Sequence, residues 1–171
     1  MTLTDEMGRQ QRVTSDPLGR QWQTEVWNWN GSVYSTTTNT FNGRDQVTQV
    51  RQTDNATGAY QDTTMTYDGY GRLHTKHVPE QQVESNNSAS TDHTTWAYND
   101  DDTINSATDA RGASATYGYS NRYQVTSINY TAPAGITATS NVTYAYDGAG
   151  NRTSMTDGLA ARATVTISFR S

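Results

Sequence analysis

The chain has 171 residues, a formal net charge of −5 and a sequence pI near 5.0. Its one lysine, Lys76, leaves no basic stripe for nucleic acid, and the absence of cysteine leaves no disulfide framework and no cysteine-based metal site. No apolar run approaches transmembrane length, and the first residues lack the basic-then-apolar order of a secretory signal. We therefore expect no nucleic-acid partner, no transmembrane segment and no signal peptide in this chain.

The composition favours a thin sheet over an aliphatic core. Leu, Ile, Val and Phe together make up well under a fifth of the chain, which is a range typical of disorder. Against disorder stand the small net charge, the regular recurrence of 11 Tyr and 4 Trp, and 30 Thr, a β-branched residue that favours strands. We expect Tyr, Trp and Thr surfaces on strands.

Residues 67–73, with the sequence YDGYGRL, predict a hairpin turn with a strand on each side. Asp68 suits the first turn position, where its carboxylate accepts backbone N–H groups, and Gly71 can take a positive φ without a Cβ clash. That combination predicts a type I turn closed by a G1 bulge. Asp68 then lies opposite Arg72, and Tyr67 lies opposite Leu73.

Variants of these seven positions recur along the chain. They occur at residues 27–33 (WNWNGSV), 41–47 (FNGRDQV), 98–104 (YNDDDTI), 119–125 (YSNRYQV) and 146–152 (YDGAGNR), where Asp147 and Gly150 match Asp68 and Gly71. Asp45 and Asp102 tolerate a positive φ at modest cost, but Tyr123 is a poor residue for that position. We expect a different turn type at Tyr123.

A second series has Ser or Thr before Asp and Gly three residues later. It comprises Asp16 with Gly19, Asp109 with Gly112, and looser copies at 53–58, 131–135 and 156–158. The turns of both series start at Asp5, Asp16, Asn28, Asn42, Asp54, Asp68, Asn99, Asp109, Ser120, Ala132, Asp147 and Asp157. Most gaps between them are 10 to 15 residues, which leaves strands of ordinary length and predicts an antiparallel meander.

If the aromatic turns lie along one side of the sheet and the Thr-Asp turns along the other, two places break the alternation. Residues 28–42 join two aromatic turns, so either residues 35–39 form an extra turn or one assignment is wrong. Residues 79–92 are polar and predict a long loop. We divide one continuous repeat domain into residues 1–78, the loop 79–92 and residues 93–171, with a final strand at 164–169.

The motifs at 67–73 and 146–152 resemble the tyrosine-aspartate repeats of the Rhs/YD-repeat family. Related repeats build bacterial Rhs toxins, the shells of insecticidal toxin complexes, and teneurins. The resemblance implies an all-β fold: an antiparallel up-and-down meander of short strands with YD-repeat hairpins, forming a curved strip or partial shell. In full-length relatives the shell encloses a C-terminal toxin or displays it at the cell surface.

The resemblance also implies partners and a location. The partners would be the remainder of a parent Rhs chain or its C-terminal cargo, and the chain would be secreted or at the cell surface as part of a bacterial parent. The sequence has no segment similar to the Rhs core that closes the shell and cleaves the toxin, so we expect a fragment, a truncated gene product or a remnant of a larger Rhs gene, without self-cleavage or toxicity. Unpaired strand edges predict self-association.

No group of residues predicts catalysis, a metal or a cofactor. His74 and His77 would point to opposite faces of a strand, so we expect surface or cross-strand histidines. Residues 99–102 (NDDD) lack the EF-hand pattern and predict an acidic turn tip. The recurring Asp residues are explained by turn chemistry, and we expect a chain that is not an enzyme.

The alternative function is a carbohydrate-binding surface module, because Tyr and Trp faces stack on sugar rings. Candidate glycan-binding residues are Trp27, Trp29, Tyr67, Tyr98, Tyr119 and Tyr146. The competing interpretation, which we favour, is that these aromatics fill the packing of the sheet itself.

Overall fold

The structure is a computed structural model that describes residues 1–81 and 92–158. These residues form thirteen strands and one short 3₁₀ helix, η1 (Pro79–Gln81). The strands are β1 (Thr2–Thr4), β2 (Gln10–Ser15), β3 (Gln21–Trp27), β4 (Val33–Phe41), β5 (Val47–Asp54), β6 (Tyr60–Tyr67), β7 (Leu73–His77), β8 (Thr94–Tyr98), β9 (Ile104–Thr108), β10 (Ser114–Tyr119), β11 (Val125–Thr131), β12 (Val142–Tyr146) and β13 (Arg152–Asp157). The chain divides into two compact units, Met1–His93 and Thr94–Ser171.

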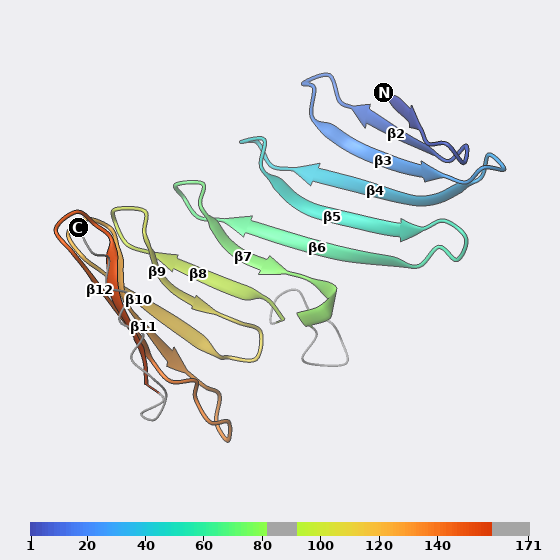
Figure 1. Cartoon of the computed structure of the whole chain (residues 1–171). Coiled ribbons are helices and arrows are strands. Elements are labelled where there is room, and N and C mark those ends of the chain that lie inside the picture. Colours follow the sequence, from blue (N-terminus) through green and yellow to red (C-terminus); the bar gives the residue numbers. More distant parts are fainter. Residues whose placement is uncertain (82–91, 159–171) are drawn as a thin grey trace. The chain divides into compact units, whose positions relative to one another are not determined.

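In the first unit, β1 to β7 pair in chain order, and every pair is antiparallel (Figure 1). This is the predicted up-and-down meander, and it is open, because among the described residues β1 pairs only with β2. Turns that start at Asp16, Asn42 and Asp68 lie at one end of the sheet. Turns that start at Asp5, Asn28 and Asp54 lie at the other end.

The placement of two turns corrects the sequence analysis. β4 runs for nine residues without an extra turn, so Asn28 and Asn42 lie at opposite ends of the sheet. Grouping the Asn28 turn with the aromatic turns at Asn42 and Asp68 was wrong. The turn at Asp16 lies at their end of the sheet instead. In a meander the count of preceding strands decides the end at which a turn lies, whatever residue comes before it.

In the second unit, β8 to β13 also pair in chain order, and the turns at Asn99, Ser120 and Asp147 share one end. The Asp109 turn and the β11–β12 connection lie at the other end, so the predicted alternation holds in this unit. The predicted strand at 164–169 and most of the predicted loop at 79–92 lie outside the described residues.

The turn of residues 67–73 has the geometry expected from the sequence. Asp68 N–H donates to the Arg72 carbonyl at 2.9 Å, Gly71 N–H donates to the Asp68 carbonyl at 3.0 Å, and Tyr67 pairs with Leu73 after a register shift. Gly71 has φ 89°. The expectation of another turn type at Tyr123 was wrong, because Tyr123 has φ 61° and its N–H donates to the Ser120 carbonyl at 3.0 Å.

Neither unit has an aliphatic core. None of the hydrophobic side chains that the structure describes is buried, and its buried polar residues are His77 and Asp92. Most strand side chains are half-buried, as in β12, where Val142 and Tyr146 are half-buried and Thr143 is exposed. Backbone ladders and contacts between neighbouring side chains therefore hold each sheet together.

Candidate functional site

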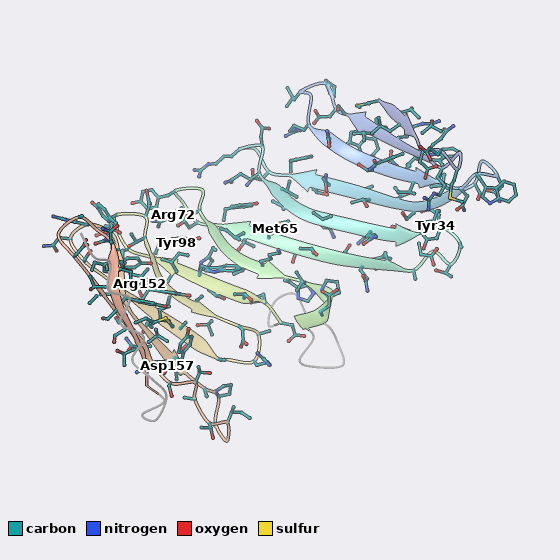
Figure 2. All side chains as sticks on the ribbon, in the orientation of Figure 1. Tyr34, Met65, Arg72, Tyr98, Arg152 and Asp157 are labelled. Atoms are coloured by element: carbon teal, nitrogen blue, oxygen red, sulfur yellow. The ribbon has the colours of Figure 1, made fainter. Side chains whose placement is uncertain are left out.

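The acidic residues at the turn starts bind their own turns. The Asp68 carboxylate accepts N–H groups of Tyr70 at 3.0 Å and Arg72 at 2.9 Å through one oxygen, and the Arg72 Nε at 2.7 Å through the other. Partial burial alone would raise the pKa of Asp68, but the hydrogen bonds from the Arg72 side chain and these amides outweigh it and lower the pKa below its usual value. Figure 2 shows Arg72 at this turn between β6 and β7. An ionised, fully bonded carboxylate of this kind is not arranged to transfer protons.

The other predicted turn residues are arranged alike. Asp16, Asp109 and Asp147 each accept two turn amides. Asp16 also pairs with Arg20 at 2.6 Å, and Asp109 with Arg111 at 2.7 Å. The Gly residues three positions after these acids have positive φ: Gly19 at 83°, Gly112 at 84° and Gly150 at 91°.

Contacts between successive turns at one end of each sheet form what we call the turn ladder. In the first unit it joins the turn at Asn42 to the turn at Asp68. Arg44 donates to the Gly69 carbonyl at 2.9 Å. Gln46 donates to the Gly71 carbonyl at 2.6 Å. In the opposite direction, the Tyr67 hydroxyl donates to the carbonyl of Val47 at 2.8 Å.

The second unit repeats the turn ladder between the turns at Ser120 and Asp147. Arg122 donates to the Gly148 carbonyl at 2.5 Å, and Gln124 donates to the Gly150 carbonyl at 2.9 Å. The Tyr146 hydroxyl donates to the Val125 carbonyl at 2.8 Å. Partners in both units are 20 to 26 residues apart in sequence, the distance of two strands and two turns.

Glycine has two roles in the turns that accept these bonds. Gly71 and Gly150 supply the positive φ, and a Cβ at either position would lie 3.2 Å from the Nε2 atom of Gln46 or Gln124. A Cβ at either position would therefore crowd the carboxamide, for which glycine leaves room.

The turn-ladder side chains were missed by the sequence analysis. Arg44, Gln46, Arg122 and Gln124 are exposed or half-buried polar residues that look unremarkable singly. The signal was a pairing: R-x-Q at 44–46 and 122–124 is followed about 25 residues later by G-x-G at 69–71 and 148–150.

The six candidate glycan-binding residues do not share one environment. The hydroxyls of Tyr67, Tyr146 and Tyr119 donate to backbone carbonyls, Tyr119 to that of Ile104 at 2.9 Å. Tyr98 is half-buried at the end of β8.

The two tryptophans of that set lie at the opposite end of the first unit from Tyr67. The Arg12 guanidinium covers the Trp27 ring at 4.6 Å, and the indole N–H bonds Glu25 at 3.0 Å. Trp29 is 79% exposed at a turn tip.

Two tyrosines that the sequence analysis did not select line a groove of about 460 Å³ in the first unit, with Gln52, Thr53 and Gln61 among its other residues. Tyr34 and Tyr60 are 60% and 59% exposed. Figure 2 shows Tyr34 at the start of β4. These residues follow turns, whereas the sequence motif pointed to aromatics that precede them.

The histidines and the acidic turn offer no metal site. His74 is exposed, whereas His77 pairs with Thr64, is buried, and bonds the Asp92 carbonyl through Nδ1. Asp101 accepts the backbone N–H of Thr103 at 3.1 Å, a bond within the acidic turn itself. Within the described ranges no group of three His, Cys, Asp or Glu is arranged to hold a metal ion. No helix in those ranges has the length and apolar character to span a membrane.

Comparisons with known proteins show a fold likeness. No protein-family profile and no curated protein sequence matches the chain. Among solved structures, the TcdB2-TccC3-Cdc42 crystal structure matches with TM-score 0.55 and 15% identity over 86% of this chain and 9% of that chain. TcdB2-TccC3 without its hypervariable C-terminal region matches with TM-score 0.55 and 14% identity, over 88% and 9%. The Photorhabdus luminescens Tc holotoxin pore matches with TM-score 0.51 and 13% identity, over 91% and 11%. This chain therefore spans about a tenth of the length of each matched chain.

Proposed function

We propose that this chain is a non-catalytic structural segment of an Rhs/YD-repeat protein, part of a β-shell whose wall continues in the parent chain. The turn ladder is the observation that carries the proposal. In each unit it joins one hairpin to the next through side chains that end on backbone carbonyls, so these hairpins are stabilised by their neighbours along the sheet.

The lack of a core supports the same function. A single layer with no buried hydrophobic side chain among its described residues suits a wall, and its stability depends on nearest neighbours as in repeat proteins. The fold likeness to segments of far longer Tc toxin chains agrees with this role. The partners are then the rest of the parent chain or its C-terminal cargo, at the surface of a bacterium or outside it.

Small-angle scattering of the chain tests the wall. A compact domain of this length has a radius of gyration of roughly 15–16 Å, and an open layer should exceed that value. Light scattering at micromolar concentration should also show association through strand edges. A monodisperse 18.9 kDa monomer with the compact radius would refute the proposal.

A second function, carbohydrate binding, is favoured by the groove between Tyr34 and Tyr60. The two exposed rings flank amide and hydroxyl side chains, the combination that stacks on and bonds a sugar. The Arg51 guanidinium lies 4.0 Å from the Tyr60 ring centre and holds its orientation, since Asp62 binds Arg51 through two bonds. Saturable glycan-array binding should be lost in Tyr34→Ala and kept in Trp29→Ala; equal binding by both variants would exclude this groove.

A further inference from the structure

The turns of the ladder are of two kinds. Donor turns, which start at Asn42 and Ser120, carry Arg at the third and Gln at the fifth position and reach the next turn. Acceptor turns, which start at Asp68 and Asp147, carry Gly at the fourth position, and their fifth residue bonds back to their own Asp. A donor turn therefore precedes each acceptor turn in both units.

The turn at Asp16 has the two features that define an acceptor turn. Its fifth residue, Arg20, bonds Asp16, and its fourth residue, Gly19, has φ 83°. The difference lies in what covers the glycine. Gly71 and Gly150 are half-buried beneath a Gln carboxamide, whereas Gly19 is exposed and, apart from its chain neighbours, no atom lies within 4 Å of the position of its Cβ.

The strand register fixes where a donor turn for Gly19 would be. In the first unit, Gln49 pairs with Thr64, so Thr48 lies opposite Met65, three residues before Asp68. Met1 exchanges two backbone bonds with Val13, which is three residues before Asp16. Met1 thus occupies the position of Thr48.

The same register appears in the second unit. There, Ser127 pairs with Thr143, so Thr126 lies opposite Tyr144, again three residues before the acceptor Asp147. Thr48 and Thr126 each follow the first residue of their donor turn by six positions. Met1 stands at the same register position, so a donor turn for the Asp16 turn would start six residues before Met1.

We propose that the Asp16 turn is an open acceptor site for a donor turn that directly precedes Met1, with Gln two residues and Arg four residues before it. These are the offsets of Gln46 and Arg44 from Thr48. The inference rests on the proposed function, since it names the next piece of the same wall. The Gln carboxamide binds the Gly19 carbonyl, and the Arg guanidinium binds the carbonyl of Pro17, the counterpart of Gly69.

A second copy of this chain cannot supply the donor turn. Both of its donor turns are already bonded to their own acceptor turns, and its last described turn, at Asp147, has Ala149 at the third position and Asn151 bonded to Asp147 at the fifth. The site also lacks the third ladder contact, because Ser15 stands where Tyr67 and Tyr146 stand. Two contacts, one of them from a guanidinium, remain to give it specificity.

The test adds a donor turn to the full chain. Residues 37–47 (TTNTFNGRDQV) are copied directly before Met1, which puts the copies of Gln46 and Arg44 at the required positions and a strand beside β1. The matched extension has Ala in place of these two copies. Each is also made with Gly19→Asn, since Asn tolerates a positive φ but fills the space above the turn, and with Gly8→Asn as control. Gly8 has φ 75° and the same open surroundings, in the turn that joins β1 to β2.

We expect the intact extension, which adds two hydrogen bonds, to raise the urea midpoint of the first unit by roughly 1.3–2 M over the alanine extension. Gly19→Asn should abolish this difference, and Gly8→Asn should keep it. If both extensions stabilise β1 equally, or if the difference survives Gly19→Asn, the acceptor site is refuted. The proposed structural function is not affected by either result. If neither extension stabilises the chain, the proposed function fails as well. If the unextended chain forms a dimer and Gly19→Asn abolishes that dimer, a second copy fills the acceptor site. This result would refute the proposal that a preceding donor turn fills it.

Discussion

Removing single hydroxyl groups tests whether the turn ladder stabilises the sheets. In Tyr67→Phe and Tyr146→Phe the ring stays, and the bond to the carbonyl of Val47 or Val125, 2.8 Å long in each case, is lost. A net hydrogen bond of this kind contributes about 1 kcal/mol to the free energy of unfolding. With a urea dependence of about 1–1.5 kcal/mol per M for a unit of this size, the midpoint should fall by roughly 0.7–1 M.

The assay is urea unfolding followed by circular dichroism, with one control in each unit. Tyr70→Phe and Tyr123→Phe remove hydroxyls from rings that are 86% and 65% exposed, so their midpoints should stay within about 0.1 M of the wild-type value. Ladder variants whose midpoints also stay within about 0.1 M would refute the reasoning, because the hydroxyl bonds would then contribute nothing beyond what water supplies.

Three further predictions concern backbone strain, close contact and pH. Tyr123→Gly should raise the free energy of unfolding by roughly 1 kcal/mol, since φ 61° is costly for a residue with a Cβ; an unchanged or lower value would contradict the strain. Gly71→Ala should cost more than Gly135→Ala, by up to about 1 kcal/mol, because both pay for a positive φ but only the first crowds the Gln46 carboxamide, at 3.2 Å. The hydrogen bonds from Arg51 lower the pKa of Asp62 below 3.8, so this pair stabilises the fold above about pH 4 and the contribution is lost as the pH falls through the folded-state pKa. The urea midpoint of Asp62→Asn should therefore vary less between about pH 6 and pH 2.5 than that of the wild type, and equal slopes would show that the pair is not stabilising.

The meander and its turns could be predicted from local sequence, because a type I turn with a G1 bulge is specified within five residues. Asp68 and Gly71 are enough to place it. The end of the sheet at which a turn lies depends on every strand before it, which is why Asn28 was placed wrongly from its flanking tryptophans. Tyr123 was judged on its intrinsic cost alone, while its two neighbours in the turn, Arg122 and Gln124, bond the next hairpin and hold it in place.

The turn ladder was out of reach of the same reasoning because its partners are separated by two strands. The register of β5 with β6 and of β11 with β12 decides which residues of two turns lie side by side. Composition and motif spacing carry no register. The register can be inferred only from the joint recurrence of R-x-Q and G-x-G. This recurrence is visible once the two turns are compared as a pair.

Contacts between turns explain why the aromatic position of the repeat varies without loss of the fold. At Phe41 no hydroxyl reaches the preceding turn, and there the Arg20 guanidinium lies 4.7 Å from the Phe41 ring centre and bonds Asp45 at 2.6 Å. The same connection is thus made by an arginine from the preceding turn instead of a tyrosine from the following one. At this place a contact that one turn cannot make is made by a side chain of its neighbour, so the connection between hairpins belongs to two successive turns. A lone Tyr-Asp motif describes only half of it.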